Sequence, residues 1–218
     1  TLQEVCSRKL GLGVQDVLNI AQALYEIHKA TTYPRSDCRF LPESMFDEVP
    51  AVLEALLTTD PGLQVAFDRL DRSMRSRAWN DTKVTAHHGI IPTTEPANLA
   101  RMSEPERQVY ELIRSHYLAQ FLPHHEFDRT QVELECGGQR LTAMGKQILV
   151  HGWKSLLDDT AGNDEPRQKP QVLPALKQGT QCTVNDVELQ ALRTTAPKPL
   201  TEGELIKAMQ NVAKLVCD

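Results

Sequence analysis

The sequence lacks most of the motifs that assign a protein to a function quickly. It has no run of about 18 apolar residues and no charged-then-apolar leader, so it predicts neither a membrane span nor a secretory signal. It also has no glycine-rich phosphate loop, no GxSxG and no HExxH, which are signatures of NTPases, α/β-hydrolases and zinc proteases. We therefore expect a cytoplasmic protein with no membrane partner and a function outside those classes.

Cysteines are sparse as well. Five are scattered through the 218 residues, and no two form a CxxC pair. This spacing is typical of reduced thiols in a reducing compartment rather than of a disulfide framework. We predict no metal site in this chain.

The charge balance gives no strong sign of a nucleic-acid partner. A net charge of −5 argues mildly against binding through a uniformly basic surface. The segment 69–83 differs, because it holds Arg69, Arg72, Arg75, Arg77 and Lys83 against only two aspartates. It is either a solvated helix face or a phosphate-binding strip.

Apolar residues recur at helical spacing in three segments of the first 123 residues. Residues 14 to about 29 form an amphipathic helix that ends before Tyr33, because Pro34 forces the preceding residue toward extended geometry. A second helical region covers 43–58, with Pro50 in the first turn of a fresh helix. A third covers 104–121, where Ser103 and Glu106 form a capping box.

After Pro123 the pattern changes to alternation. The residues around Gly137-Gly138 predict a β-hairpin, and further strands are predicted at 148–150 and 187–191. The polar stretch 158–170 reads as a loop. Thr201 and Glu204 form a second capping box at the start of a final helix.

These elements predict an α+β fold that is mostly α. We expect a helical domain at 1–123, a β-rich domain at 124–196 and the start of another helical domain at 197–218. The first residue is Thr1 rather than methionine, and the last helix has only begun to use its apolar face. We therefore expect the chain to be an internal piece of a longer protein.

Two short segments could carry chemistry. Residues 31–37 (TTYPRSD) place Tyr33 on a proline-stiffened loop beside Arg35, which sets an oxygen nucleophile near a cation that binds phosphate in a bidentate manner. Residues 86–93 (AHHGIIPT) carry His87 and His88. Neighbours in a strand point to opposite faces, so we expect one of them to act in a hydrogen-bonded active site. From these residues alone, an ordinary surface turn explains the first segment better and the second equally well, and His124-His125 reads as structural.

Five separated motifs together resemble one family. Residues 32–42 (TYPRSDCRFLP) are similar to the active-site segment of the topoisomerase III branch of the type IA DNA topoisomerases, and 86–93 is similar to that family's downstream histidine motif. Residues 76–81 (SRAWND), 118–123 (LAQFLP) and 198–209 (KPLTEGELIKAM) match it as well. Several motifs in the right order are hard to obtain by chance. The proline after Tyr33 and the double histidine favour topoisomerase III over topoisomerase I.

The resemblance implies roles for particular residues. Tyr33 would attack a backbone phosphate in single-stranded DNA to form a 5′-phosphotyrosine, Arg35 would steady the scissile phosphate, and His87 would support the hydrogen-bond network. We expect further DNA contacts from Thr32, Asp37, Arg77, Lys83, His88 and Thr201. The parent enzyme would cut one strand, pass another and reseal without ATP, with the helical domain as a lid and the β-rich domain as part of the hinge of the arch.

The family also requires Mg²⁺ bound by an acidic Toprim domain, and no segment here matches one. We therefore expect that domain elsewhere in the same polypeptide, this chain to be inactive alone, and the parent to be a monomeric, nucleoid-associated bacterial enzyme. Two other interpretations stay open. One is a noncatalytic single-stranded DNA-binding or interaction module in which Tyr33 and Arg35 only contact phosphate, and the other is a noncatalytic scaffold.

Overall fold

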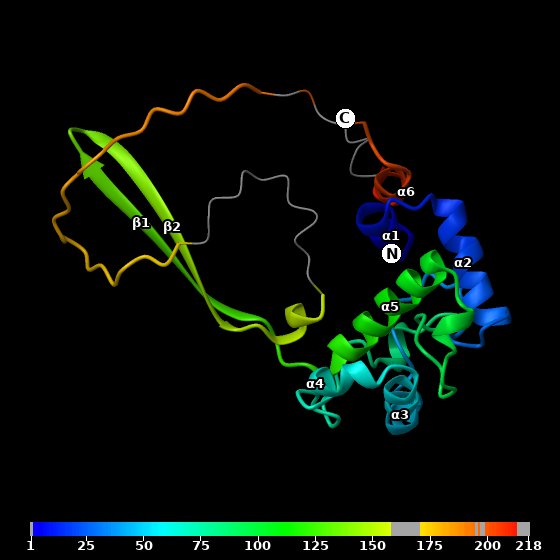
Figure 1. Ribbon diagram of the computed structural model, residues 1–218. Helices are drawn as coiled ribbons and strands as arrows, with labels where there is room; N and C mark the ends of the chain where they lie inside the picture. The colour runs from blue at the N-terminus through cyan, green and yellow to red at the C-terminus, as the bar shows by residue number, and fades with distance from the viewer. Residues whose placement is uncertain (1, 158–170, 195, 197–198, 213–218) are drawn as a thin grey trace. The chain divides into compact units, whose positions relative to one another are not determined.

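The chain divides into two compact units in a computed structural model that describes residues 2–157, 171–194, 196 and 199–212 (Figure 1). The helical unit comprises Thr1–His125, Val150–Asn163 and Leu200–Asp218. The hairpin unit comprises Glu126–Leu149 and Asp164–Pro199.

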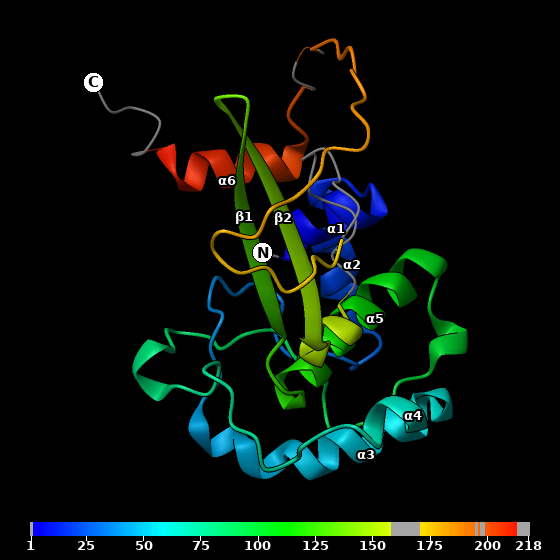
Figure 2. The same cartoon turned by 90° about the vertical axis from the view of Figure 1, so that its left-hand side faces the viewer.

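Six α-helices and several 3₁₀ turns build the described part of the helical unit (Figure 2). The helices are α1 (Leu2–Leu10), α2 (Val14–Glu26), α3 (Val49–Thr59), α4 (Gln64–Phe67), α5 (Glu104–Leu118) and α6 (Glu202–Gln210). The 3₁₀ turns are Glu43–Glu48, Pro61–Leu63, Asp81–Lys83, Leu99–Arg101, Ala119–Phe121 and Gly152–Ser155. The predicted helices are confirmed as α2, as α3 with the turn before it, as α5 with the turn after it, and as α6. Neither α1 nor α4 was predicted.

The local signals in the sequence act where they were expected. Pro50 lies in the first turn of α3. The backbone N–H of Ser103 donates to the Glu106 carboxylate at 2.7 Å, which closes the capping box of α5. Helix α2 ends at Glu26, slightly earlier than expected, and Lys29 has a positive φ of 54° that turns the chain toward Tyr33.

The core of the helical unit lies among α2, α3 and α5. Leu24, Leu53 and Phe121 are buried there together with Tyr110, and burial raises the pKa of the Tyr110 phenol. Arg114 is also buried, and its guanidinium donates to the Asp60 carboxylate at 3.0 Å, so this buried charge is paired. These contacts give the unit a well-packed framework of its own.

Helix α6 packs against α1 inside the helical unit. The Lys207 ammonium lies 2.7 Å from a Glu4 carboxylate oxygen, and the Glu202 carboxylate accepts from the backbone N–H of Val14 at 2.9 Å. The predicted capping box at Thr201 and Glu204 is present. The functional domain boundaries expected at 123 and 196 stay a prediction.

The hairpin unit is built on two long strands, β1 (Glu126–Cys136) and β2 (Gln139–Val150), which pair as a two-stranded sheet. Gly137 and Gly138 form the predicted two-residue turn, and their φ values of 57° and 75° explain why glycine stands at both positions. The strand expected at 148–150 is the end of β2. The segment after residue 170 passes beside β2, where the backbone N–H of Lys146 donates to the carbonyl of Gln171 at 3.0 Å.

One predicted strand is wrong. Residues 187–191 alternate in polarity but are not in a strand, and Val187 and Leu189 are 80% and 96% exposed. Alternation favours a strand only where a neighbouring strand pairs with it and one face is buried, and neither condition holds there. The loop predicted at 158–170 lies outside the described residues. The described residues are mostly helical with one small antiparallel sheet, which is consistent with the predicted α+β class.

The 126–149 segment leaves and rejoins the helical unit at neighbouring positions. The backbone N–H of Trp153 donates to the carbonyl of Pro123 at 3.0 Å, and Nδ1 of His125 lies 3.2 Å from the carbonyl oxygen of His151. Gly152 has a φ of 52°, and any Cβ there would collide with the carbonyls of Pro123 and His124. The two ends of the 126–149 segment are therefore held close together. In the part of the chain that the structure describes, no helix has the length and apolar character needed to cross a membrane.

Candidate active site around Tyr33

The segment that carries Tyr33 is held by the segment that carries the two histidines. Thr31 and Pro92 form an isolated antiparallel bridge. The backbone N–H of Thr32 donates to the carbonyl of Ile91 at 2.9 Å, and the N–H of Ile91 donates back to the Thr32 hydroxyl at 3.0 Å. These two segments are about sixty positions apart in the sequence, so the bridge fixes a contact that no local signal specifies.

The Tyr33 ring lies against two other rings. The Tyr33 and His87 centroids are 4.6 Å apart with the rings tilted by 45°, and Tyr25 of α2 meets Tyr33 edge-on at 5.7 Å. Tyr33 nevertheless remains 36% exposed. The side chain is thus oriented by neighbours and still accessible to a partner.

The residues after Tyr33 make a second set of links to the histidine segment. The Ser36 hydroxyl donates to the carbonyl of His87 at 3.3 Å and accepts from the N–H of Cys38 at 3.1 Å. The N–H of Gly89 donates to the carbonyl of Phe40 at 2.8 Å. The loop therefore runs alongside 87–91 over most of its length, which keeps Tyr33 and His87 in register.

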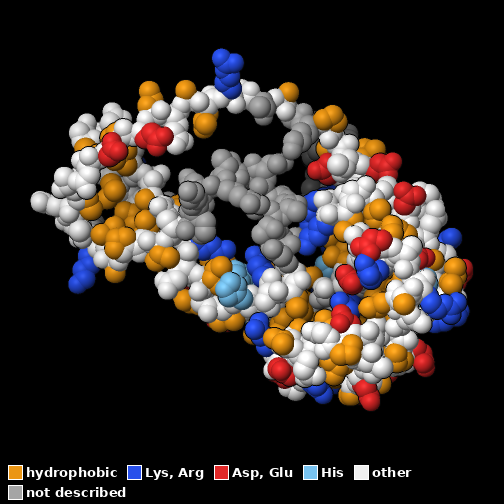
Figure 3. All heavy atoms as spheres, in the orientation of Figure 1, with side chains coloured by type: hydrophobic (Ala, Val, Ile, Leu, Met, Phe, Trp, Pro, Cys, Tyr) orange, Lys and Arg blue, Asp and Glu red, His pale blue; other side chains and the backbone are white. Residues whose placement is uncertain are grey.

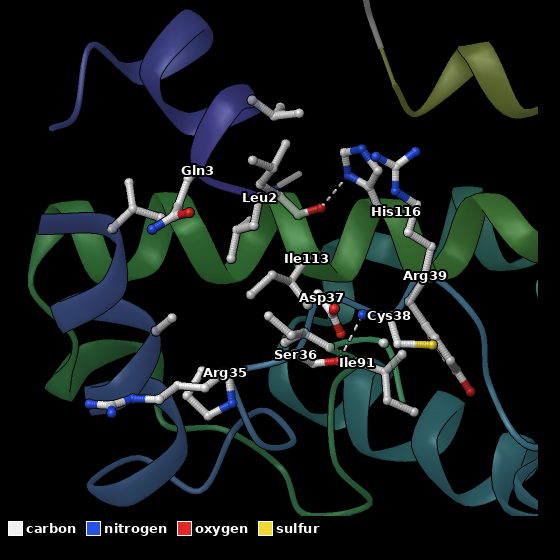
Figure 4. A pocket seen from close by; sticks show the side chains of 18 of the residues that line it. Leu2, Gln3, Arg35, Ser36, Asp37, Cys38, Arg39, Ile91, Ile113 and His116 are labelled. Carbon is white, nitrogen blue, oxygen red and sulfur yellow. Dashed lines mark hydrogen bonds between the residues drawn. The ribbon is translucent and has the colours of Figure 1, made fainter. Parts of the chain in front are cut away.

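Arg35 and Asp37 are exposed, and no ion pair to Arg35 is found among the described residues. Both line a hollow of about 1070 Å³ in the helical unit, between the 34–41 segment and helices α1, α2 and α5 (Figure 4). Figure 4 shows Arg35 extending away from Asp37, while Ile91 and Ile113 contribute apolar wall. The guanidinium is thus available to an anionic partner.

The two histidines differ in their surroundings. They lie in a loop rather than a strand, so strand alternation does not explain the difference. The exposed ring of His87 contacts Tyr33, whereas Nδ1 of the half-buried His88 lies 2.8 Å from the carbonyl oxygen of Gly89. An Nδ1–H donor would make this a hydrogen bond, which leaves Nε2 of His88 for other partners.

The basic strip at 69–83 contributes two of the expected DNA contacts. Leu41 pairs with Trp79 in an isolated parallel bridge, which brings this strip beside the Tyr33 loop. Arg77 is exposed, and the Lys83 ammonium lies 5.0 Å from the centroid of the Phe40 ring. Figure 3 shows basic and acidic side chains interspersed over the visible face of the helical unit, so that face is not uniformly basic.

The two threonines among the expected DNA contacts already serve the fold. The Thr32 hydroxyl accepts from Ile91, as described above, and the Thr201 hydroxyl accepts from the backbone N–H of Glu204 at 3.3 Å as the cap of α6. Each hydroxyl can still donate its own hydrogen. Because α6 packs against α1, nothing in these contacts brings Thr201 to Tyr33.

Metal ligands do not gather at this site. Among the described residues there is no group of three or more histidine, cysteine, aspartate or glutamate side chains that could hold an ion. The residues around Tyr33 therefore do not fit Mg²⁺.

Tyr25 is a site residue that the sequence did not reveal. Its position on the apolar stripe of α2 predicts a core residue, yet it is only half-buried and touches Tyr33. No sequence signal distinguishes it from its neighbours on the stripe, because the contact depends on how the chain turns at Lys29.

Comparison with known proteins gives a consistent result. The sequence model of a family described as DNA topoisomerase matches residues 1–213. The chain is 39% identical to DNA topoisomerase 3 of Pasteurella multocida over 219 residues and 39% identical to that of Haemophilus influenzae over 221, in each case covering 100% of this chain and 33% of the relative. DNA topoisomerase 3 of Vibrio cholerae is 37% identical over 217 residues, again with 33% of the relative covered. The chain thus spans about a third of the length of these curated relatives.

Proposed function

Because this chain belongs to the type IA DNA topoisomerase family, on its topoisomerase III branch, we propose that it is the part of such an enzyme that carries the cleaving tyrosine. The observation that carries the proposal is the contact of Tyr33 with His87, within two motifs that the family resemblance singles out. The parent enzyme would cut one strand of single-stranded DNA, pass another strand and reseal the cut without ATP.

The proposed reaction is a transesterification. The phenol oxygen of Tyr33 attacks the phosphorus of a backbone phosphodiester, and the bond from phosphorus to the 3′-oxygen breaks. The phenol gives up its proton and the leaving 3′-oxygen takes one, so the products are a 5′-phosphotyrosine and a free 3′-hydroxyl. Resealing is the reverse attack by that hydroxyl, and no external energy source is required because the phosphoester is conserved.

Arg35 and His87 would assist this step in different ways. Arg35 is exposed and outside any described ion pair, so its guanidinium can bind the scissile phosphate and the charge that develops on it. The His87 ring lies against Tyr33 and can orient the phenol and its hydrogen bonds. Arg77, Lys83, His88 and Asp37 would line the path of the strand, with Thr32 and Thr201 as weaker contributors.

Mg²⁺ would be held by a Toprim domain in a part of the parent outside this chain, where it would assist the phosphoryl chemistry. The described residues of this chain hold no group of three or more histidine, cysteine, aspartate or glutamate side chains for the ion. The parent would act as a monomer in the bacterial cytoplasm, at the nucleoid. The hairpin unit would form part of the hinge of the arch, and the helical unit would be the lid that lifts with the 5′ end attached.

The test is covalent capture of DNA by the full-length parent. Tyr33→Phe should abolish the adduct on a labelled oligonucleotide in a denaturing gel while leaving single-strand affinity nearly intact, because phenylalanine keeps the ring and removes only the attacking oxygen. Arg35→Ala should lower the cleavage rate by on the order of tenfold or more with a smaller loss of affinity. His87→Ala should slow cleavage more than His88→Ala does.

An adduct that persists in Tyr33→Phe would place the nucleophile elsewhere. DNA binding without any adduct in the unmodified parent would favour the noncatalytic binding module. The isolated chain should form no adduct with Mg²⁺ present.

A further inference from the structure

Tyr25 precedes the proposed nucleophile, Tyr33, in the sequence and contacts its ring. The histidine motif follows Tyr33 in the sequence and contacts the same ring through His87. Its ring meets Tyr33 edge-on, with centroids 5.7 Å apart and planes at 87°. Edge-to-face pairs at this separation are favourable, because the positive edge of one ring faces the negative face of the other. The Tyr25 ring also lies 5.9 Å from the Lys29 ammonium, within the range of a cation–π contact.

Tyr25 and Tyr33 lie on different kinds of backbone, a helix and a loop. Tyr25 lies in the last turn of α2, next to the buried Leu24. Past the helix end, the Thr93 hydroxyl donates to the carbonyl of Lys29 at 2.7 Å, which anchors the turn into the Tyr33 loop. Tyr25 therefore presents its ring from a helix, whereas Tyr33 extends from an irregular loop.

An exposed tyrosine on a loop samples several side-chain rotamers, and only one of them can place its oxygen in line with a phosphate. His87 restricts the Tyr33 ring on one contact surface. Without a second contact, the ring could still swing away from His87 into solvent. Tyr25 supplies that second contact, and it does so without covering the ring, since Tyr33 stays 36% exposed.

We propose that Tyr25 is a positioning residue that holds the Tyr33 ring in its reactive rotamer. This inference rests on the proposed function of Tyr33 as nucleophile. The restriction of the Tyr33 ring by Tyr25 does not depend on that function. Loss of an aromatic pair of this kind should lower the population of the reactive rotamer by about threefold to tenfold. The cleavage rate of the bound complex should fall by the same factor, and affinity for DNA should not change.

The kinetic test uses the full-length parent with Tyr25→Phe, Tyr25→Leu and Tyr25→Ala. Ile27→Ala is the matched control, because Ile27 lies just past the end of the same helix and is 69% exposed. Single-turnover cleavage at saturating oligonucleotide should be unchanged in Tyr25→Phe and Ile27→Ala. It should fall about threefold to tenfold in Tyr25→Leu and Tyr25→Ala, with the oligonucleotide dissociation constant and the unfolding midpoint of Tyr25→Leu unchanged. Equal losses of rate and affinity would make Tyr25 a DNA contact and overturn the proposal.

A second measurement does not depend on activity. With 3-fluorotyrosine incorporated at position 33, the ¹⁹F resonance should report a restricted ring in the unmodified parent and in Tyr25→Phe. It should shift toward the value of free fluorotyrosine in Tyr25→Leu. An unchanged resonance in Tyr25→Leu would disprove the positioning role even if the parent cleaves DNA. A shifted resonance in a parent that forms no adduct would leave the positioning role in place and reject the nucleophile assignment.

Discussion

In the helical unit Leu24, Leu53 and Phe121 are at most 1% exposed, whereas in the hairpin unit Phe127 and Leu141 are both 44% exposed. The first unit packs its apolar side chains between helices, and the described residues of the second offer only two strands and a coil segment against which to pack them. A two-stranded hairpin is marginally stable by itself in water. Tyr33 and His87, to which we assign roles in the proposed cleavage step, belong to the unit that has a core of its own.

The largest expected contrast between the units is in thiol reactivity. Cys6 of α1 is fully buried, and burial raises the pKa of its thiol to about 12, whereas Cys136 and Cys182 of the hairpin unit are exposed. Maleimide labelling followed by peptide mass spectrometry at pH 8 should modify Cys6 more slowly by on the order of a thousandfold, because labelling requires the helical unit to open. In concentrated urea the three rates should converge. Comparable rates in native buffer would mean that α1 is not packed.

The next contrast is in the cost of removing an apolar side chain. Leu53→Ala should lower the free energy of unfolding by about 2–5 kcal/mol, because Leu53 is fully enclosed in the core of the helical unit. Leu141→Ala on β2 should cost less than about 1 kcal/mol, because much of that side chain already contacts water. Urea unfolding followed by circular dichroism measures both. A cost at Leu141 as large as that at Leu53 would show that the hairpin unit has a core.

The smallest contrast is in acid sensitivity. The backbone N–H of Ser103 holds the pKa of Glu106 below its ordinary value of 4.5, and His28 lies 3.4 Å from the same carboxylate. A lowered folded-state pKa stabilises the fold above the unfolded value, and this stabilisation is lost as the pH falls below 4.5 and through the folded pKa. Glu106→Gln should therefore reduce the loss of unfolding free energy on acidification by about 0.5–1 kcal/mol.

The matched control for that prediction is Glu133→Gln, which replaces an exposed carboxylate on β1. Its unfolding free energy should follow that of the unmodified chain from pH 7 to about pH 3. An equal change in both variants would mean that the acid sensitivity does not come from the capping box.

The sequence could be interpreted where a signal acts locally and could not where it depends on a distant partner. Ser103 with Glu106, Thr201 with Glu204 and Pro50 are local signals, and each acts within one turn of the backbone, so the helices they mark were predictable. The hairpin turn at Gly137-Gly138 was predictable for the same reason. The strand predicted at 187–191 was wrong because a strand depends on a pairing partner, and periodicity does not reveal one.

The candidate site follows this rule at longer range. Spacing alone favoured an ordinary turn at Tyr33, and only the family resemblance paired it with His87. The pairing depends on the bridge between Thr31 and Pro92, which joins segments that are distant in sequence. The role of Tyr25 was not predictable, because an apolar helical stripe predicts burial. It does not predict a contact with a ring past the end of the helix, such as that of Tyr33.

Gly152 has a consequence for how such a chain can vary. Its close approach to the carbonyls of Pro123 and His124 makes the 126–149 segment an insertion whose two ends share a single attachment point. Residues could be added to or removed from the tip of the hairpin in strand-matched pairs without moving that point. The length of the hairpin can therefore differ between related proteins without a change in the surroundings of Tyr33. A residue with a side chain at position 152 would displace the carbonyls of Pro123 and His124 and so move the attachment point.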